Sequence, residues 1–417
     1  MKVIHLLRKL DASEWSGTEV ATHRLFEGLR QHGVKPVAYC PRVAGDGEDP
    51  LSTSGFEVQR FKAFVPVLGL SRTRKKQLVS VGGNLMSFGL IPALWRERGF
   101  SIVHTHTLGR LGGIALTLAK QRRVPFVVSI HGGVLDLPDE LKPAFNSPPD
   151  RGWEWGRVFG LLFQSRRLFK DADAILTCNE REAGLIRSSL PGKRVLVQPH
   201  GVPTELYRQD QREVARTAFP EIRNRQILLC VGRIDPVKNQ GWLVEQAPRI
   251  FQKHPRALLV LAGPCTDEPY GAKVRKRITE LGVADRVIMT GGLASSDPRL
   301  IGLLQSADLL LLPSISETFG LVLLEAWAAG IPVLSTNASG PSALVRPGDN
   351  GWLFDLKEPE GFHRALDWML ANPDAARAMA ARGAEVSDRF SVRALAGRMK
   401  SMYENLIEEK NALRDYP

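Results

Sequence analysis

Cysteine is scarce in this sequence, with four residues among 417. Cys40, Cys178, Cys230 and Cys265 lie far apart and form no C-x-x-C pair. Neither a zinc site nor a disulfide framework is therefore indicated. We interpret the four thiols as small apolar groups of strands or strand ends.

Long apolar runs are also missing. No uninterrupted stretch reaches the roughly 20 residues that a transmembrane helix requires. Met1 leads directly into the short apolar stretch 3–7, which favours a first strand over a secretion signal. We therefore expect a cytoplasmic protein without a leader or a membrane span.

Two function classes lack their usual signals. No G-x-G-x-x-G follows either leading strand, which argues against a nicotinamide dehydrogenase. The net charge of +12 supports a basic nucleic-acid-binding protein as an alternative, but aromatic residues make up only 7% of the chain and do not interleave with the basic segments. We expect no nucleic acid partner.

The positive charge is concentrated in the first half of the chain. Residues 1–200 contain 29 Lys and Arg against 18 Asp and Glu, whereas residues 201–417 contain 27 against 26. The densest cluster, Arg72, Arg74, Lys75 and Lys76, follows the apolar stretch 64–70. Such a segment suits an anionic lipid surface, so we predict a peripheral position on the inner face of a membrane, with an ordinary solvated face as the alternative.

Apolar runs and amphipathic stretches alternate along the chain with the spacing of βαβ units. A chain of this length can bury two cores. We predict an α/β fold with two Rossmann-like, doubly wound domains that face each other across a cleft. The first domain covers residues 1–200, together with a C-terminal helix at about 390–417 that crosses back to it, and the second covers residues 201–389. The helices expected in the first domain are 18–32, 77–98, 109–121, 157–171 and 180–189.

The stretch 313–330 carries the strongest functional signal. It follows the apolar run 308–312, which is typical of a strand buried on both faces, and it continues as a helical pattern from Phe319. The loop between them would then join the carboxyl end of a strand to a helix amino terminus, where open α/β sheets bind ligands. We expect the amides of Phe319, Gly320 and Leu321 to form an anion site in the first turn. Glu317 and Glu325 frame this site, and carboxylates beside a phosphate pocket suit sugar and ribose hydroxyls.

A second strand end has the same form. The buried-type run 226–231 opens into Gly232 and Arg233, and Lys238 follows before the next helix. Two cations aimed at the same crevice as a helix amino terminus would neutralise a diphosphate without a metal ion. We therefore predict that the two loops converge on one pyrophosphate.

These residues resemble motifs of the retaining glycosyltransferases of family 4, which have the GT-B fold. Glu317 and Glu325 match the E-x7-E signature of that family, and Gly232, Arg233 and Lys238 match its phosphate-gripping residues. The likeness continues over nearly the whole chain, through the segments 16–19, 104–106, 129–132, 199–202 and 261–263. Ser16 and His200 stand where many members have glycine and asparagine.

The resemblance implies roles for several residues. His131, at the end of a strand before two glycines, would contact the donor sugar near the reacting carbon, and Gly17 would touch the donor phosphate or the acceptor. Leu293 would lie in a turn that receives the nucleobase. Thr318 lies within the expected anion site. We predict no cofactor and no metal, and we interpret the D-x-D form at 171–173 as a surface turn.

The expected reaction moves a hexose from a UDP-, GDP- or ADP-linked sugar to a hydroxyl, with retention of configuration. Catalysis would rest on His131, Arg233, Lys238 and Glu317. We expect a lipid-linked or glycan acceptor, in polysaccharide or lipopolysaccharide assembly, because the first half is basic. A sugar-nucleotide epimerase or hydrolase of the same fold is the main alternative. His104 and His106 alternate along one strand, so we expect them on opposite faces, in structural roles.

Overall fold

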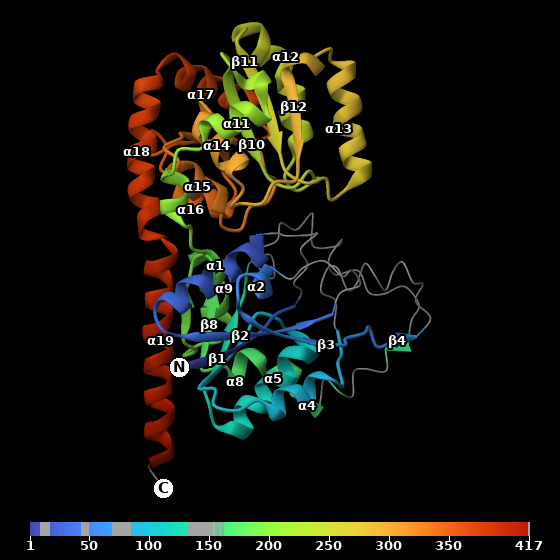
Figure 1. Cartoon of the computed structure of the whole chain (residues 1–417), viewed down its shortest axis with the longest axis vertical. Helices are drawn as coiled ribbons and strands as arrows, with labels where there is room; N and C mark the ends of the chain where they lie inside the picture. Colours follow the sequence, from blue (N-terminus) through green and yellow to red (C-terminus); the bar gives the residue numbers. More distant parts are fainter. Residues whose placement is uncertain are drawn as a thin grey trace. The chain divides into compact units, whose positions relative to one another are not determined.

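A computed structural model of the chain describes residues 1–8, 17–42, 50–68, 85–131, 153–154, 159 and 162–415 (Figure 1). The chain divides into two compact units. Unit 1 contains Met1–Pro199 and Arg393–Pro417, and unit 2 contains His200–Val392. Both units are α/β with a parallel sheet, as the sequence predicts.

Unit 1 is built on a seven-stranded parallel sheet in the order β3-β2-β1-β5-β6-β8-β9. Its strands are β1 Lys2–Leu6, β2 Lys35–Pro41, β3 Glu57–Phe61, β5 Ile102–Thr105, β6 Phe126–Ser129, β8 Ala174–Thr177 and β9 Val195–Val197. Its helices are α1 Gly17–Gln31, α2 Pro50–Thr53, α4 Leu90–Arg96, α5 Gly109–Arg122, α8 Leu168–Asp171, α9 Glu180–Ser189 and α19 Val392–Asp415. A separate antiparallel pair joins β4 Val67–Leu68 to β7 Trp153–Glu154.

The last helix, α19, closes one face of this sheet. Neighbouring strand residues such as Val3 and Ile4 are both fully buried and point to opposite faces, because side chains alternate along a strand. Ile4 packs in the cluster that contains α4, α5 and α8, and Val3 packs in the cluster that contains Tyr403 and Leu406 of α19. The red helix of Figure 1 is therefore an integral part of the unit 1 core from Arg393 onward.

Unit 2 has a six-stranded parallel sheet in the order β12-β11-β10-β13-β14-β15. Its strands are β10 Gln226–Val231, β11 Ala257–Ala262, β12 Val287–Gly291, β13 Leu309–Leu312, β14 Val333–Thr336 and β15 Trp352–Phe354. Its helices are α10 Thr204–Arg208, α11 Arg212–Ala218, α12 Gln240–Lys253, α13 Glu268–Glu280, α14 Pro298–Ser306, α15 Leu321–Ala328, α16 Ser339–Leu344, α17 Pro359–Ala371 and α18 Pro373–Arg389. The four leucines of β13 are 0 to 1% exposed, as expected for a strand that is covered on both faces.

Helix α15 is fixed by its packing against α18. Trp327 of α15 is fully buried, and its indole N–H donates to the carbonyl of Asn350 at 3.0 Å. The ring lies directly against Gly383 of α18, where no side chain would fit. The hydroxyl of Ser387 donates to the carbonyl of Leu324 at 2.9 Å. The two helices are thus held in one register.

Two helices predicted from the sequence are wrong in extent. Within the described part 85–98 of the helix expected at 77–98, only α4 is helical, because Met86 pairs with Phe64 in an isolated antiparallel bridge and the Ser87 hydroxyl accepts the amide of Leu90 at 3.0 Å. Residues 77–84 lie outside the described chain. The helix expected at 157–171 is interrupted at Gln164, which adopts a left-handed backbone with φ 55°. Residues 159 and 162 before it are helical, and a 3-10 turn at Ser165–Arg167 and then α8 follow it.

No helix within the described ranges is both long enough and apolar enough to cross a membrane. The basic cluster Arg72, Arg74, Lys75 and Lys76 lies outside those ranges.

The contact between α15 and α18 can be tested by mutation. Gly383→Ala would push a methyl group into the ring of Trp327, and overpacking of this kind costs about 1 to 3 kcal/mol. We expect unit 2 to unfold at a lower urea concentration, and tryptophan fluorescence measures the midpoint of this unfolding. Gly361→Ala in α17 is the matched control, because its nearest neighbour is the tip of Arg364 at 3.9 Å and alanine favours a helix. Equal midpoints for the two variants would contradict the packing described.

Candidate functional site

The strand order of unit 2 creates a crevice at one edge of its sheet. From β10 the chain moves outward through β11 and β12, and it then returns to place β13 on the other side of β10. The loops that follow β10 and β13 therefore leave the sheet in opposite directions at the carboxyl ends of adjacent strands. Ligands of open α/β sheets bind at such a switch point. The two loops predicted from the sequence to carry function, 232–239 and 313–320, are these two loops.

The loop after β10 holds its cations by its own hydrogen bonds. The guanidinium of Arg233 lies 3.1 Å from the carboxylate of Asp235, which also accepts the backbone amide of Lys238 at 2.9 Å. The fully buried side chain of Gln240 donates to the Arg233 carbonyl at 2.7 Å. The Arg233 side chain remains 45% exposed, so its charge is available to a ligand.

The two loops meet, as the sequence predicts. The ammonium of Lys238 forms an ion pair with the carboxylate of Glu317, and the amide of Ile315 donates to the carbonyl of Val237 at 2.8 Å. The side chains of Lys238 and Glu317 are only 21% and 13% exposed, which places the pair between the loops. One ammonium has three donors, so Lys238 can keep Glu317 and still reach an anion.

Glu317 also connects this pair to the start of α15. A side chain at Gly320 would lie 3.8 Å from the Cγ atom of Glu317, so the glutamate passes beside the amino terminus of the helix. The prediction that Phe319 and Gly320 belong to the first helical turn is wrong. The helix begins at Leu321, and Gly320 is its N-cap with φ 87°, a left-handed conformation that favours glycine. The amides of Leu321 and Val322 head the helix instead.

Phe319 has a packing role that the sequence did not reveal. Its side chain is 6% exposed, and its ring meets His200 at 5.6 Å and Phe390 at 5.7 Å between ring centroids. An apolar ring buried before the N-cap resembles a hydrophobic staple, which fixes the direction in which the chain enters the helix. The aromatic anchor therefore holds the amino terminus of α15 in place.

Glu325 is the fifth residue of α15, and it is only 6% exposed. It is therefore not an ordinary solvated helix residue. Thr318 is half-buried in the same loop as Glu317, and Leu293 is half-buried in the loop that follows β12. The predicted residues of the second domain thus lie in the loops that follow strands or at the start of α15, except Glu325, which lies in the second turn of that helix.

Close backbone contacts support the crevice from two sides. Any side chain at Gly263 would collide with the carbonyl of Gly232, and one at Gly340 would meet the backbone of Phe319 and Glu317. The Gly340 amide donates to the Glu317 carbonyl at 2.8 Å. The contact between Gly263 and Gly232, 31 residues apart in the chain, is not predictable from the sequence of either loop alone.

Unit 1 contains a cluster of histidines at its own switch point, between β1 and β5. His131 follows β6, and its Nε2 atom lies 2.7 Å from Nδ1 of His106. The expectation that His104 and His106 lie on opposite faces is wrong, because their rings stack with centroids 4.3 Å apart. The strand ends at Thr105, so the alternation of side chains does not extend to His106. Gly17 begins α1.

The two aspartates of the D-x-D form take part in ion pairs within unit 1. Asp171 forms ion pairs with Lys120 and Arg167, and the Arg167 pair has a distance of 2.8 Å. Asp173 forms an ion pair with Lys410 of α19 at 2.7 Å. Asp173 also accepts the amide of Phe126 at 2.8 Å. These contacts give both carboxylates a structural role.

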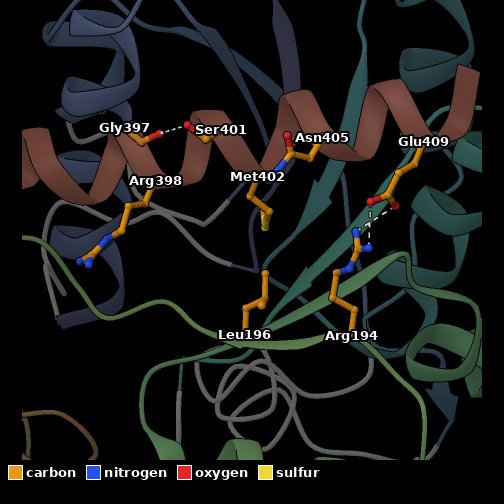
Figure 2. Close-up of a pocket in the computed structure, with 8 residues that line it drawn as sticks. All are labelled: Arg194, Leu196, Gly397, Arg398, Ser401, Met402, Asn405 and Glu409. Atoms are coloured by element: carbon orange, nitrogen blue, oxygen red, sulfur yellow. Dashed lines mark hydrogen bonds and ion pairs between the residues drawn. The ribbon is translucent and has the colours of Figure 1, made fainter.

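A groove of about 560 Å³ also lies in unit 1, between β9 and α19 (Figure 2). Met402 and Leu196 approach each other across it, and Arg194 is held at one end by two hydrogen bonds to Glu409, of 2.9 and 3.0 Å. Arg398, Ser401 and Asn405 line its α19 side. None of the predicted site residues lines this groove, so it is separate from the crevice of unit 2.

Both halves of the chain match models of one kind of protein. Residues 211–386 match a family model described as glycosyl transferases group 1, and residues 16–201 match a glycosyl transferase 4-like domain. Two relatives are named D-inositol 3-phosphate glycosyltransferases. That of Thermobispora bispora is 28% identical over 78% of this chain and 76% of its own length, and that of Catenulispora acidiphila is 28% identical over 76% and 73%.

Solved structures show the same fold. HepE of Anabaena in complex with UDP has a TM-score of 0.73 at 17% identity, and the match covers 97% of this chain and all of HepE. Sucrose-phosphate synthase of Thermosynechococcus elongatus has a TM-score of 0.72 at 20% identity, over 98% of this chain and all of the synthase. WaaG, a glycosyltransferase involved in lipopolysaccharide biosynthesis, has a TM-score of 0.65 at 19% identity, over 96% and 99%.

His131 should remain neutral through the physiological pH range. Desolvation, with the positive charge of Arg8 as a second cause, lowers its pKa to about 4. An NMR titration of its ring, assigned with His131→Gln, should give a midpoint near 4. The unfolded chain takes up this proton near pH 6.5, so the contribution to stability is present above that pH and is lost as the pH falls from about 6.5 toward 4. A midpoint at or above 6 would contradict the desolvation of this ring.

Proposed function

The chain belongs to the GT-B glycosyltransferases of family 4, and on this premise we propose that it moves a hexose from a nucleotide sugar to a hydroxyl acceptor, with retention and without a metal ion. That it is a glycosyltransferase with a nucleotide-sugar donor follows from the family. The observation that carries the finer proposal is the meeting of the two loops at Lys238 and Glu317.

The diphosphate of the donor binds in the crevice of unit 2 in this proposal. Arg233 and Lys238 supply two positive charges, and the amino terminus of α15 adds partly positive amides at Leu321. These donors are fixed before the substrate arrives, since Asp235 and Glu317 hold the two cations in place. Negative charge that develops on the leaving phosphate therefore meets groups that need little reorganisation. This is the work that a metal ion would otherwise do.

The two glutamates take the hydroxyl groups of the donor. Glu317, adjacent to Lys238 and Gly320, is placed for the hydroxyls of the sugar, and Glu325 for those of the ribose. Carboxylates accept hydrogen bonds from hydroxyls and repel phosphate, which sets the orientation of the donor. Thr318 and Leu293 contribute loop contacts to the phosphate and the nucleobase, and the base is uracil, guanine or adenine. We propose that His131 and Gly17 are the contribution of unit 1 to donor binding.

The proposed reaction proceeds on one face of the sugar. The bond from the anomeric carbon to the phosphate oxygen breaks, and a bond to the acceptor oxygen forms from the same side. The proton of the acceptor hydroxyl passes to the departing phosphate, which becomes a nucleoside diphosphate. Configuration is retained because attack and departure share one face. Among the proteins with a similar fold, HepE has solved structures in complex with UDP and with UDP-glucose.

The acceptor in this proposal is an anionic or lipid-linked glycan, as in polysaccharide or lipopolysaccharide assembly. Relatives are named for inositol 3-phosphate, an anionic acceptor, and residues 1–200 of this chain are strongly basic. In unit 1 the side chains of Phe88 and Leu162 are 51% and 65% exposed, and Arg166 and Arg167 are also exposed. Apolar and cationic groups on one unit support a peripheral contact with the inner face of a membrane.

Lys238→Met should reduce transfer strongly while the fold is kept. The substitution removes one preformed charge from the leaving group and keeps an apolar stem, so we expect kcat to fall by about 100-fold. The measurement is release of nucleoside diphosphate with UDP-, GDP- and ADP-sugars, in EDTA. Lys253→Met is the matched control, because Lys253 pairs with Asp367 on the surface of α12 and should give normal turnover. Normal turnover of Lys238→Met, or loss of wild-type activity in EDTA, contradicts the site.

NMR of the product must show retained configuration, and release of an epimer or free sugar as the main product identifies an epimerase or hydrolase instead.

Membrane contact is tested by flotation with vesicles that contain an anionic lipid. Wild-type protein should float, and reversing the charges at Arg72, Arg74, Lys75 and Lys76 to glutamate should abolish flotation, since each basic residue contributes about 1 kcal/mol near such a surface. Reversal of Arg216, Arg275, Arg277 and Lys276 in unit 2 is the control. The proposal fails if the wild type stays in the soluble fraction or if the first variant still floats.

A further inference from the structure

The two loops of the unit 2 crevice carry equal numbers of cations and anions. The charged residues of the loop after β10 are Arg233, Asp235 and Lys238, and that of the loop after β13 is Glu317. Each cation has a carboxylate partner. Arg233 lies 3.1 Å from Asp235, and Lys238 forms an ion pair with Glu317. The formal charges of the four side chains therefore sum to zero, although the loops present two cationic groups to a ligand.

The part of the chain that carries these loops is also nearly neutral. Residues 201–417 contain 27 Lys and Arg against 26 Asp and Glu, whereas residues 1–200 contain 29 against 18. Net positive charge attracts anions over a distance, and the crevice has little of it. What the crevice supplies is N–H groups at close range, from the Lys238 ammonium, the Arg233 guanidinium and the Leu321 amide.

The carboxylate of Glu317 is held in place by its surroundings. The Glu317 carbonyl accepts the amide of Gly340 at 2.8 Å and the hydroxyl of Ser339 at 3.4 Å. The Glu317 side chain is 13% exposed and that of Lys238 is 21% exposed. Breaking an ion pair in such surroundings leaves one charge poorly solvated, which is costly. An anion that reaches the Lys238 ammonium therefore also lies close to a fixed negative charge.

This arrangement distinguishes the two nucleotides of a transfer reaction. In a nucleotide sugar the terminal phosphate is esterified, whereas in a free nucleoside diphosphate it has a second ionisation with a pKa of about 6. At neutral pH the free nucleotide thus carries about one more negative charge, on the phosphate that the proposed function places beside Lys238. The ester instead carries sugar hydroxyls, which donate hydrogen bonds to a carboxylate. The Glu317 carboxylate therefore favours the ester over the free nucleotide.

The same carboxylate does not oppose the transfer step. While the bond from the anomeric carbon to the phosphate oxygen breaks, the sugar gains positive charge as the phosphate gains negative charge. The total charge beside Glu317 is then unchanged. After transfer the sugar is bonded to the acceptor, and the proton that the phosphate received from the acceptor hydroxyl passes to water. Only the product that remains carries the additional charge that Glu317 repels.

We propose that Glu317, through its ion pair with Lys238, is a specificity-determining residue that disfavours the free nucleoside diphosphate and so promotes its release after transfer. Asp235 has the same effect beside Arg233, but a weaker one, because that guanidinium is 45% exposed and water screens its charge. That the ligand is a nucleotide rests on the proposed function, whereas the charge balance of the two loops does not.

Removing the negative charge of Glu317 should strengthen binding of the product. Glu317→Gln keeps the length of the side chain and an oxygen that accepts from Lys238. We expect the Kd of the free nucleoside diphosphate to fall about tenfold, as for one unit charge a few ångströms away in a partly buried site. The Kd of the nucleotide sugar should stay the same or rise. Isothermal titration calorimetry in EDTA, with UDP, GDP and ADP and with their glucose esters, measures both constants.

Glu360→Gln is the matched control, because it breaks an exposed ion pair with Arg249 between α17 and α12 and should leave both Kd values as in the wild type. A folding defect weakens binding of every ligand, so a gain of affinity for one nucleotide does not arise from a merely structural role of Glu317. Asp235→Asn should shift the ratio of the two Kd values in the same direction by a smaller factor. It provides the test if Glu317→Gln does not fold.

A double variant tests whether Lys238 carries the effect. Lys238→Met in the Glu317→Gln background restores the charge balance and should remove the gain in affinity for the free nucleotide. The proposal is overturned if both nucleotides bind and the ratio of their Kd values is the same in wild type and variant, or if the gain persists without Lys238. In either case the proposed function still stands. If neither a nucleotide nor its sugar ester binds to the wild type, the proposed function fails together with this proposal.

Discussion

The ion pair between Lys238 and Glu317 joins two loops that are almost eighty residues apart in the chain, and the rest of the site depends on it. The loops meet because β10 and β13 are adjacent strands whose connections run in opposite directions. A half-buried ion pair is costly to break, since removing one partner leaves the other charge poorly solvated. The pair therefore holds the Lys238 ammonium in place, and it also keeps Glu317 near the start of α15.

Both units place their polar residues at the same topological position. In unit 2 the switch point between β10 and β13 carries Arg233, Lys238 and Glu317, and in unit 1 the switch point between β1 and β5 carries His5 and His106. The chemistry differs. Unit 2 offers fixed cations and backbone amides, which suit phosphate, whereas unit 1 offers neutral imidazoles in a dry environment.

Local pattern was sufficient to predict the strands of unit 2 and the position of the loops after β10 and β13, because parallel strands buried on both faces are short continuous apolar runs. Arg233 and Lys238 lie in the loop after one such run and Glu317 in the loop after another, so their place at the edge of the sheet follows from the sequence. Contacts between distant segments could not be predicted. The ring of Phe319 packs on His200 and Phe390 instead of starting the helix, and His106 turns toward His104 only because β5 ends one residue earlier. The hydroxyl of Ser87, just before α4, donates to the carbonyl of Lys62. The helix prediction at 77–98 could not take this contact into account.

The central claim is that the loops after β10 and β13 bind one pyrophosphate together. A crystal structure of the chain with a nucleoside diphosphate and EDTA tests it most directly. The account predicts that the phosphate oxygens lie within hydrogen-bond distance of the Lys238 ammonium, the Arg233 guanidinium and the Leu321 amide. The claim would be contradicted if the diphosphate bound elsewhere and none of its atoms contacted either loop.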